Sequence, residues 1–171
     1  AEFLAGSRPW SNYGEHYRPL VELARARGRD VLAANAPRSL AARISTEGPE
    51  ANDPLFTARE LDLSEGPSKE RFVDVMQRLS LGESDDHVMD DAGIENMYAA
   101  QVVKDETMAE SIAHYLVGPG AETPVLHLTG RFHSDYGQGT VERLLRRMPD
   151  LRVVVLSMAE GAEAREAALD P

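Results

Sequence analysis

Short apolar runs alternate with segments of helical periodicity, and this alternation constrains the fold more than any other feature of the sequence. Residues 17–44 contain two helical patterns with an apolar run, Val31–Ala34, between them. Two further β-rich runs, Pro124–Thr129 and Arg152–Ser157, lie on either side of a helical pattern at Val141–Met148. Because strands that alternate with helices form parallel sheets, the sequence predicts an α/β fold with a mostly parallel sheet flanked by helices.

The composition changes between about residues 47 and 92, where proline, glycine, serine and acidic residues surround one amphipathic helix, Arg71–Leu79. This change predicts an acidic, Pro/Gly-rich helical insertion, or lid. A chain of 171 residues is long enough for one domain with a core and short for two. We therefore expect residues 1–171 to form a single α/β domain. Because the chain starts at Ala1 rather than at a methionine, we expect it to be a processed, engineered or trimmed product.

The charge and the apolar content restrict the partners. Against 18 basic side chains the chain has 29 acidic ones, a formal net charge of −11 that repels nucleic acid, so no nucleic acid is expected as a partner. No apolar run approaches the roughly 18 residues of a membrane span. The chain has no cysteine, which excludes disulfides, thiolate zinc sites and thiol nucleophiles.

The predicted sheet places several polar side chains on one rim. Ligands of parallel sheets bind beyond the carboxyl ends of the strands, and two loops leave such ends in this chain. His133 taken alone would more often be a surface histidine, but its loop also offers Gly137 and Gly139, whose N–H groups can face an anion before a helix. The Gly-x-Gly-x-x-Gly motif of dinucleotide-binding proteins is not present, since Glu142 occupies the position of the third glycine after Gly137 and Gly139. The side chains expected to converge are Asn35, Arg38, Arg131, His133, Asp135 and Tyr136.

A long helical pattern, Ile94–Val117, carries two polar residues on a face that otherwise reads as buried. Gln101 and Asp105 follow the helical spacing of the apolar residues around them. Buried polar groups need partners, and two explanations remain open. Either they hydrogen-bond neighbouring backbone, or the helix lines the rim and they orient a ligand, a water molecule or His133.

Two segments together resemble a known family. "NMYAAQVVKDETMAESIAHYL" at 96–116 and "PVLHLTGRFHSDYGQGTVERLLRRMP" at 124–149 are similar to the ChaN-like haem-binding lipoproteins, which are related to the TraB, Tiki and erythromycin-esterase-like proteins. The resemblance extends upstream over residues 17–44 and covers most of the chain outside the acidic stretch. Its specificity lies in the combination of Gln101, Asp105, Met108 and Ala109 with Gly130 and His133 and with Asn35, Pro37 and Arg38.

The resemblance implies a haem-binding protein of the bacterial cell envelope, lipid-anchored in the periplasm or outer membrane, that serves iron and haem uptake. It further implies a homodimer that encloses haem, and an outer-membrane receptor as a possible partner. The iron ligand would come from His133, Tyr98 or Tyr136, because imidazole and phenolate both ligate haem iron. Arg38 and Arg131 are the candidates for the propionates, and Gln101, Asp105 and Asn35 complete the expected haem-binding residues.

The chain departs from the family at its start. Family members usually open with a strand that ends in a Gly-Glu-x-His motif, and this sequence does not contain that motif. Either a segment is missing, or a second copy completes the cleft, or the site has been lost. The related esterase-like and Tiki proteins supply the alternative function, a metal-dependent or Glu/His hydrolase in which His133 is a ligand or base. A non-catalytic interaction module is the third possibility.

Overall fold

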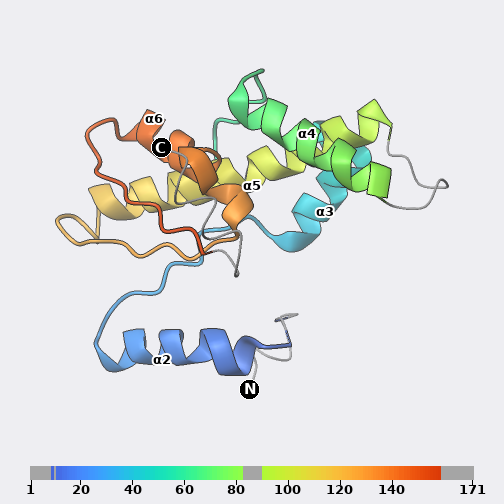
Figure 1. The fold of residues 1–171 in the computed structure, drawn as a ribbon. Helices are drawn as coiled ribbons and strands as arrows, with labels where there is room; N and C mark the ends of the chain where they lie inside the picture. Colours follow the sequence, from blue (N-terminus) through green and yellow to red (C-terminus); the bar gives the residue numbers. More distant parts are fainter. Residues whose placement is uncertain (1–8, 10, 83–89, 159–171) are drawn as a thin grey trace, which may run out of the picture. The chain divides into compact units, whose positions relative to one another are not determined.

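The computed structural model describes residues 9, 11–82 and 90–158 (Figure 1). The chain divides into two compact units, Ala1–Ala33 and Ala34–Pro171. In the first unit, a π-helical turn, η1 (Tyr13–Tyr17), continues into α2 (Arg18–Ala26). Gly28, with φ +60°, ends this helix in the left-handed conformation that glycine adopts without strain, and the first helical pattern predicted in residues 17–44 is confirmed.

The second unit is built around one long helix, α5 (Asp91–Val117). The helices α3 (Arg38–Glu47), α4 (Pro67–Gly82) and α6 (Thr140–Arg147) all pack against α5 (Figure 1). Three single 3₁₀ turns, η2 (Pro49–Ala51), η3 (Arg131–His133) and η4 (Asp135–Gly137), complete the described helical elements. The three helices predicted between residues 71 and 148 are therefore confirmed.

Each contact of α5 buries a different part of its surface. Against α3 it packs Ala99, Ala100 and Val103 on Leu40 and Ile44. Against α4 it forms a second apolar cluster, made of Phe72, Ile94, Tyr98 and Val102. Against α6 it forms a third, made of Ala109, Ile112, Ala113 and Leu144. Because neighbours cover the helix on several sides, polar residues of α5 are also buried and need internal partners.

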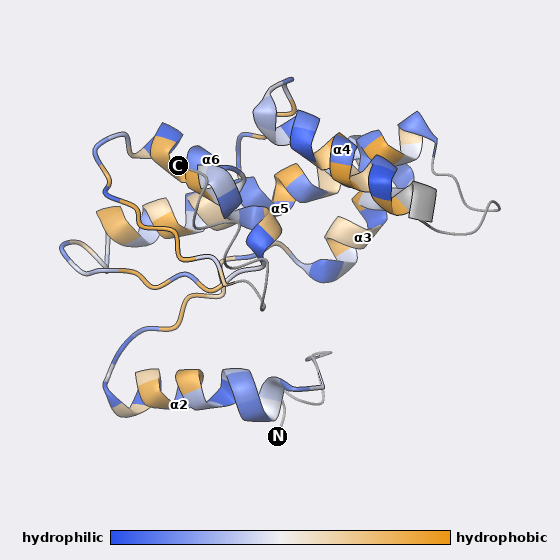
Figure 2. Ribbon diagram, in the orientation of Figure 1, coloured by the Kyte–Doolittle hydropathy of each residue, from blue (hydrophilic) through white to orange (hydrophobic). Residues whose placement is uncertain are grey.

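The predicted α/β fold with a parallel sheet is wrong. Within the described ranges the chain is helical and forms no strand, and the three apolar runs at 31–34, 124–129 and 152–157 are irregular (Figure 1). Figure 2 shows these runs as hydrophobic, yet Leu126 is 80% and Leu156 87% exposed. An apolar β-rich run favours a strand only where a partner supplies ladder hydrogen bonds and a surface to pack on, and no such pairing forms in the described part of the chain.

The stretch predicted as a lid, residues 47–92, contributes η2 and α4 to the second unit. Residues 83–89 lie outside the described part of the chain. At the end of the stretch, Asp90 caps α5, since its Oδ1 accepts a hydrogen bond from the N–H of Gly93 at 2.8 Å. Among the described helices, none is long and apolar enough to cross a membrane.

Candidate functional site

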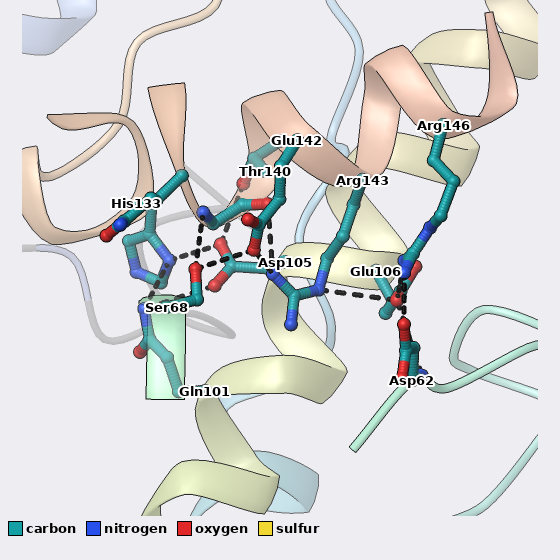
Figure 3. Close-up of polar contacts among 12 residues, drawn as sticks. Asp62, Ser68, Gln101, Asp105, Glu106, His133, Thr140, Glu142, Arg143 and Arg146 are labelled. Carbon is teal, nitrogen blue, oxygen red and sulfur yellow. Dashed lines mark hydrogen bonds and ion pairs between the residues drawn. The ribbon is translucent and has the colours of Figure 1, made fainter. Parts of the chain in front are cut away.

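The polar pair of α5 meets the histidine of the 131–139 loop. His133 Nδ1 lies 2.7 Å from Asp105 Oδ1 and 2.9 Å from Gln101 Nε2 (Figure 3). Gln101 Nε2 in turn donates to Asp105 Oδ2 at 3.3 Å. The structure thus brings together these three residues, which the sequence places in two segments about 30 positions apart; we call them the histidine site.

Asp105 is the centre of the histidine site and is 2% exposed. Besides His133 and Gln101, the hydroxyl of Thr140 donates to its Oδ1 at 2.8 Å. A buried carboxylate is stable only when its oxygens accept several hydrogen bonds or face a cation, and Asp105 has these partners. Its orientation is therefore fixed, and with it the orientation of the His133 ring.

The contact with Asp105 assigns the tautomer of His133. An ionised carboxylate only accepts hydrogen bonds, so the proton at the 2.7 Å contact with Asp105 belongs to Nδ1 of the imidazole. In this tautomer the amide nitrogen of Gln101 makes no hydrogen bond to Nδ1, because both groups are donors, and it donates to Asp105 instead. Nε2 then carries the lone pair. An imidazole held in this way by a carboxylate is the usual arrangement of a histidine that ligates a metal.

Glycine at position 139 allows the loop to close on the site. Gly139 has φ +61°, and a Cβ atom there would lie 2.6 Å from the carbonyl oxygen of His133. The close approach places Thr140, at the start of α6, beside Asp105. Two residues before Gly139, Gly137 has φ +68° with open space around it. The glycines that the sequence suggested as anion donors therefore first serve to fold the loop.

Arg71 of α4 connects that helix to the loop. Its Nη1 donates to the carbonyl oxygen of Asp135 at 3.2 Å and to Gln138 Oε1 at 3.0 Å. The guanidinium also lies over the rings of Phe132, at 5.0 Å, and Tyr136, at 4.7 Å. Arginine stacked on aromatic rings and hydrogen-bonded at its edge is held in one orientation, so Arg71 stabilises the loop that carries His133.

A buried ion cluster behind Asp105 fixes α6 on α5. Glu106 is 1% exposed and lies 3.3 Å from Arg143 Nε, while Arg146 and Arg147 donate to its two oxygens at 2.5 Å each. Burial alone would lower the pKa of Arg143, but the carboxylates of Asp105, Glu142 and Glu106 together raise it. Sequence reasoning missed this cluster, although the spacing of its three arginines along α6 is a detectable signal.

A small cavity adjoins the histidine site. It has a volume of about 20 Å³, and its lining includes Tyr98, Gln101, Asp105, Phe132 and Arg143. That volume is enough for roughly one water molecule, whereas pockets for small organic ligands measure about 300–1,000 Å³. A macrocycle therefore does not fit inside this cavity, and any such ligand has to bind against an open face.

The tyrosines predicted as iron ligands lie in opposite environments. Tyr98 is buried on α5, with its ring 5.5 Å from that of Phe72, and burial raises the pKa of its phenol although Arg143 opposes the shift. Tyr136 is 83% exposed and has φ +61°. Of the two, only Tyr136 presents its ring to the surface.

The other predicted residues lie around the loop or apart from the histidine site. Arg131 bonds Asp135 within the loop, Nε to Oδ2 at 3.1 Å, and Ser157 bonds the other oxygen of Asp135 at 2.5 Å. Asn35 and Arg38 are exposed at the start of α3, and within the described residues neither is among the hydrogen-bond partners of the histidine site. The structure therefore does not bring the predicted rim together as one set.

His127 lies near the histidine site without belonging to it. Its Nε2 is buried and has no hydrogen-bond partner among the described residues. Burial lowers the pKa of His127, and the neighbouring His133 lowers it further. The neutral imidazole is therefore the stable form at this position.

Within the described ranges, no group of three or more histidine, aspartate or glutamate side chains could hold a metal ion. A family model described as haem-binding uptake, Tiki superfamily, ChaN matches residues 1–144 of the chain. The comparisons with curated proteins and with solved structures gave no match.

Proposed function

The chain belongs to the ChaN-type haem-binding uptake family of the Tiki superfamily, and from this premise we propose that it binds haem through the imidazole of His133. The resemblance drawn from the sequence motifs is thereby confirmed at the level of the family. The single observation that carries the proposal is the 2.7 Å contact between His133 Nδ1 and Asp105 Oδ1, which leaves Nε2 available as an iron ligand.

The donor set suits haem iron. A neutral imidazole whose Nδ1–H is bound by a carboxylate is a more basic ligand than a free imidazole, and it stabilises the ferric state when iron is bound. Asp105 is in turn held by Thr140 and Gln101, so the ligand atom keeps one orientation. Haem itself supplies the iron and its redox chemistry, while the residues of the histidine site bind and orient it.

The loop is partly open to the surface, since Arg131 and Tyr136 are exposed and the side chain of His133 is 16% exposed. Tyr136 is exposed and lies three positions after His133, so it is the second candidate for an axial ligand. Because the cavity beside Asp105 is too small for a macrocycle, a second copy of the chain is a suitable cover for the other face of the haem. We accordingly extend the proposal to a homodimer that serves haem and iron uptake at the cell envelope; of these features, the description of the family names the haem-binding uptake alone.

The test is a haem titration of the purified chain, followed by absorbance in the Soret region. The wild type should give a saturable change with a simple ratio of haem to protein. His133→Ala should remove most of the affinity, and added imidazole should restore the spectrum. Asp105→Asn should weaken binding by about 10- to 100-fold, the usual effect of removing the partner of a metal-bound histidine.

His114→Ala is the matched control, because it also removes an imidazole: this histidine lies on α5, but its side chain is 59% exposed and forms no part of the histidine site. It should bind haem as the wild type does. If Tyr136→Phe abolishes the spectral change while His133→Ala preserves it, the phenolate is the ligand and the assignment to His133 is wrong. If the wild type shows no saturable change, the haem-binding proposal itself fails.

A further inference from the structure

One arginine of α4 contacts the 131–139 loop on both sides of its histidine. The Cζ atom of Arg71 lies 5.0 Å from the ring centre of Phe132, the residue before the histidine, and 4.7 Å from that of Tyr136, three residues after it. A guanidinium over an aromatic ring is attracted by the charge distribution of the ring. Because one guanidinium meets both rings, it connects the two ends of the segment that carries the histidine.

The hydrogen bonds of Arg71 hold the backbone after the histidine. Its Nη1 donates to the carbonyl oxygen of Asp135 at 3.2 Å and to Oε1 of Gln138 at 3.0 Å. The next residue after Asp135 is Tyr136, which has φ +61° and ψ +18°. A residue other than glycine rarely adopts this left-handed conformation, and it persists only where the surroundings hold it. Arg71 contributes to holding it twice, through the tyrosine ring and through the preceding carbonyl.

Neighbouring residues of α4 support the same region. Ser68, Arg71 and Phe72 share one face of α4, because they follow helical spacing. The ring of Phe72 lies 5.6 Å from that of Phe132 in an edge-to-face arrangement. Ser68 Oγ donates to Oε1 of Glu142, in the helix α6 that follows the loop, at 2.6 Å. Phe72 and Ser68 therefore hold the start of the loop and the helix after it, while Arg71 holds the part between.

The orientation of the His133 ring needs both a fixed carboxylate and a fixed backbone. Asp105, which binds Nδ1 at 2.7 Å, belongs to the long helix α5. His133 itself ends the single 3₁₀ turn η3, and rotatable bonds join its ring to the backbone. A functional side chain on a loop keeps its geometry only when contacts to rigid elements hold that loop. The contacts of Arg71 are of this kind.

We propose that Arg71 is the positioning residue of His133. Through the ring of Phe132 and the backbone after the histidine, it keeps Nδ1 of the imidazole on Asp105 and so keeps Nε2 available to a ligand. Arg71 acts through the loop and does not have to touch the ligand. Its effect on haem affinity rests on the proposed haem-binding function, whereas its effect on the tautomer of His133 in the ligand-free protein does not.

The first test needs no ligand. Nitrogen NMR of the imidazole groups distinguishes the two neutral tautomers, and His133→Ala identifies the signal of this histidine. At a pH where the imidazole is neutral, His133 of the wild type should be the Nδ1–H tautomer. Arg71→Met should give a mixture of both tautomers, because a loosened loop lets the ring leave Asp105. A role of Arg71 in stability alone would lower the free energy of unfolding and leave the tautomer unchanged.

Two further variants accompany this measurement. Arg78→Met is the matched control, because it makes the same substitution on α4 at a side chain that is 76% exposed and pairs with Asp74 at 2.9 Å. It should keep the wild-type tautomer. Arg71→Lys keeps the charge but not the planar guanidinium, and it should lie between the wild type and Arg71→Met. It also provides the same readout if Arg71→Met does not fold.

Soret titrations of the full chain with haem test the effect on the ligand. Arg71→Met should weaken binding by about tenfold, the lower end of the range for removing a group that orients a metal-bound histidine. Because Asp105→Asn acts on the same ring, adding Arg71→Met to it should weaken binding by no more than about twofold further.

The positioning role is refuted if His133 has the same tautomer or the same mixture in the wild type and in both Arg71 variants, or if the losses from Arg71→Met and Asp105→Asn add in full. If the wild type binds no haem, the proposed function fails, and the NMR spectra alone decide the role of Arg71.

Discussion

Removing the buried carboxylate of Glu106 should strongly destabilise the second unit. In its ion pair with Arg143, both side chains are more than nine-tenths buried, at 1% and 5% exposure. Breaking such a pair by deleting one partner costs about 3–5 kcal/mol, because the other charge is left buried. The partial exposure of Arg146 and the remaining contact of Arg143 with Glu142 reduce this cost. We expect Glu106→Gln to lower the free energy of unfolding by about 3 kcal/mol.

Urea denaturation followed by far-ultraviolet circular dichroism measures this loss. Glu110→Gln is the control on the same helix. The Glu110 carboxylate accepts a hydrogen bond from the backbone N–H of Arg59 at 2.8 Å, and the exposed guanidinium of Arg59 lies 3.7 Å from the same carboxylate. A glutamine can still accept from the backbone, so this change should cost less than about 1 kcal/mol. Equal losses for the two variants would refute the reasoning that burial of the Glu106 pair determines the stability of the α5–α6 contact.

Three further outcomes test individual contacts. Gly139→Ala should lower the free energy of unfolding by at least about 1 kcal/mol more than Gly137→Ala does, because both have positive φ but only the first places Cβ against the His133 carbonyl; equal urea midpoints would contradict this. Because the folded pKa of His127 is lowered, the unfolded chain binds the proton more readily, and stability should fall as the pH drops below about 6.5; His127→Phe should lessen that fall. Phe72→Ala should cost about 3–5 kcal/mol by the same denaturation assay, and a loss below about 1 kcal/mol would mean that the α4–α5 cluster repacks.

The histidine site shows which contacts the local sequence pattern can predict and which it cannot. The spacing of Gln101 and Asp105 on a helix with an apolar face showed that two polar groups would be buried, and their need for partners made His133 a candidate. The structure supplies that partner to Asp105 at 2.7 Å, and Gln101 donates to Asp105 at 3.3 Å. Thr140, Ser68 and Glu142 carry no comparable signal, because each is an ordinary polar residue until the packing of α4 and α6 brings it to the site.

The sequence by itself determined the positions of the helices, since a stripe of apolar residues at helical spacing and a terminating glycine act within one segment. It also identified the family, because the motifs that carry the resemblance are local. Only the tertiary structure decided that the apolar runs at 31–34, 124–129 and 152–157 form no sheet among the described residues and that Glu106 is buried against three arginines. Strand pairing and buried ion pairs both depend on which distant segments meet, and neither segment alone determines the free energy of those contacts.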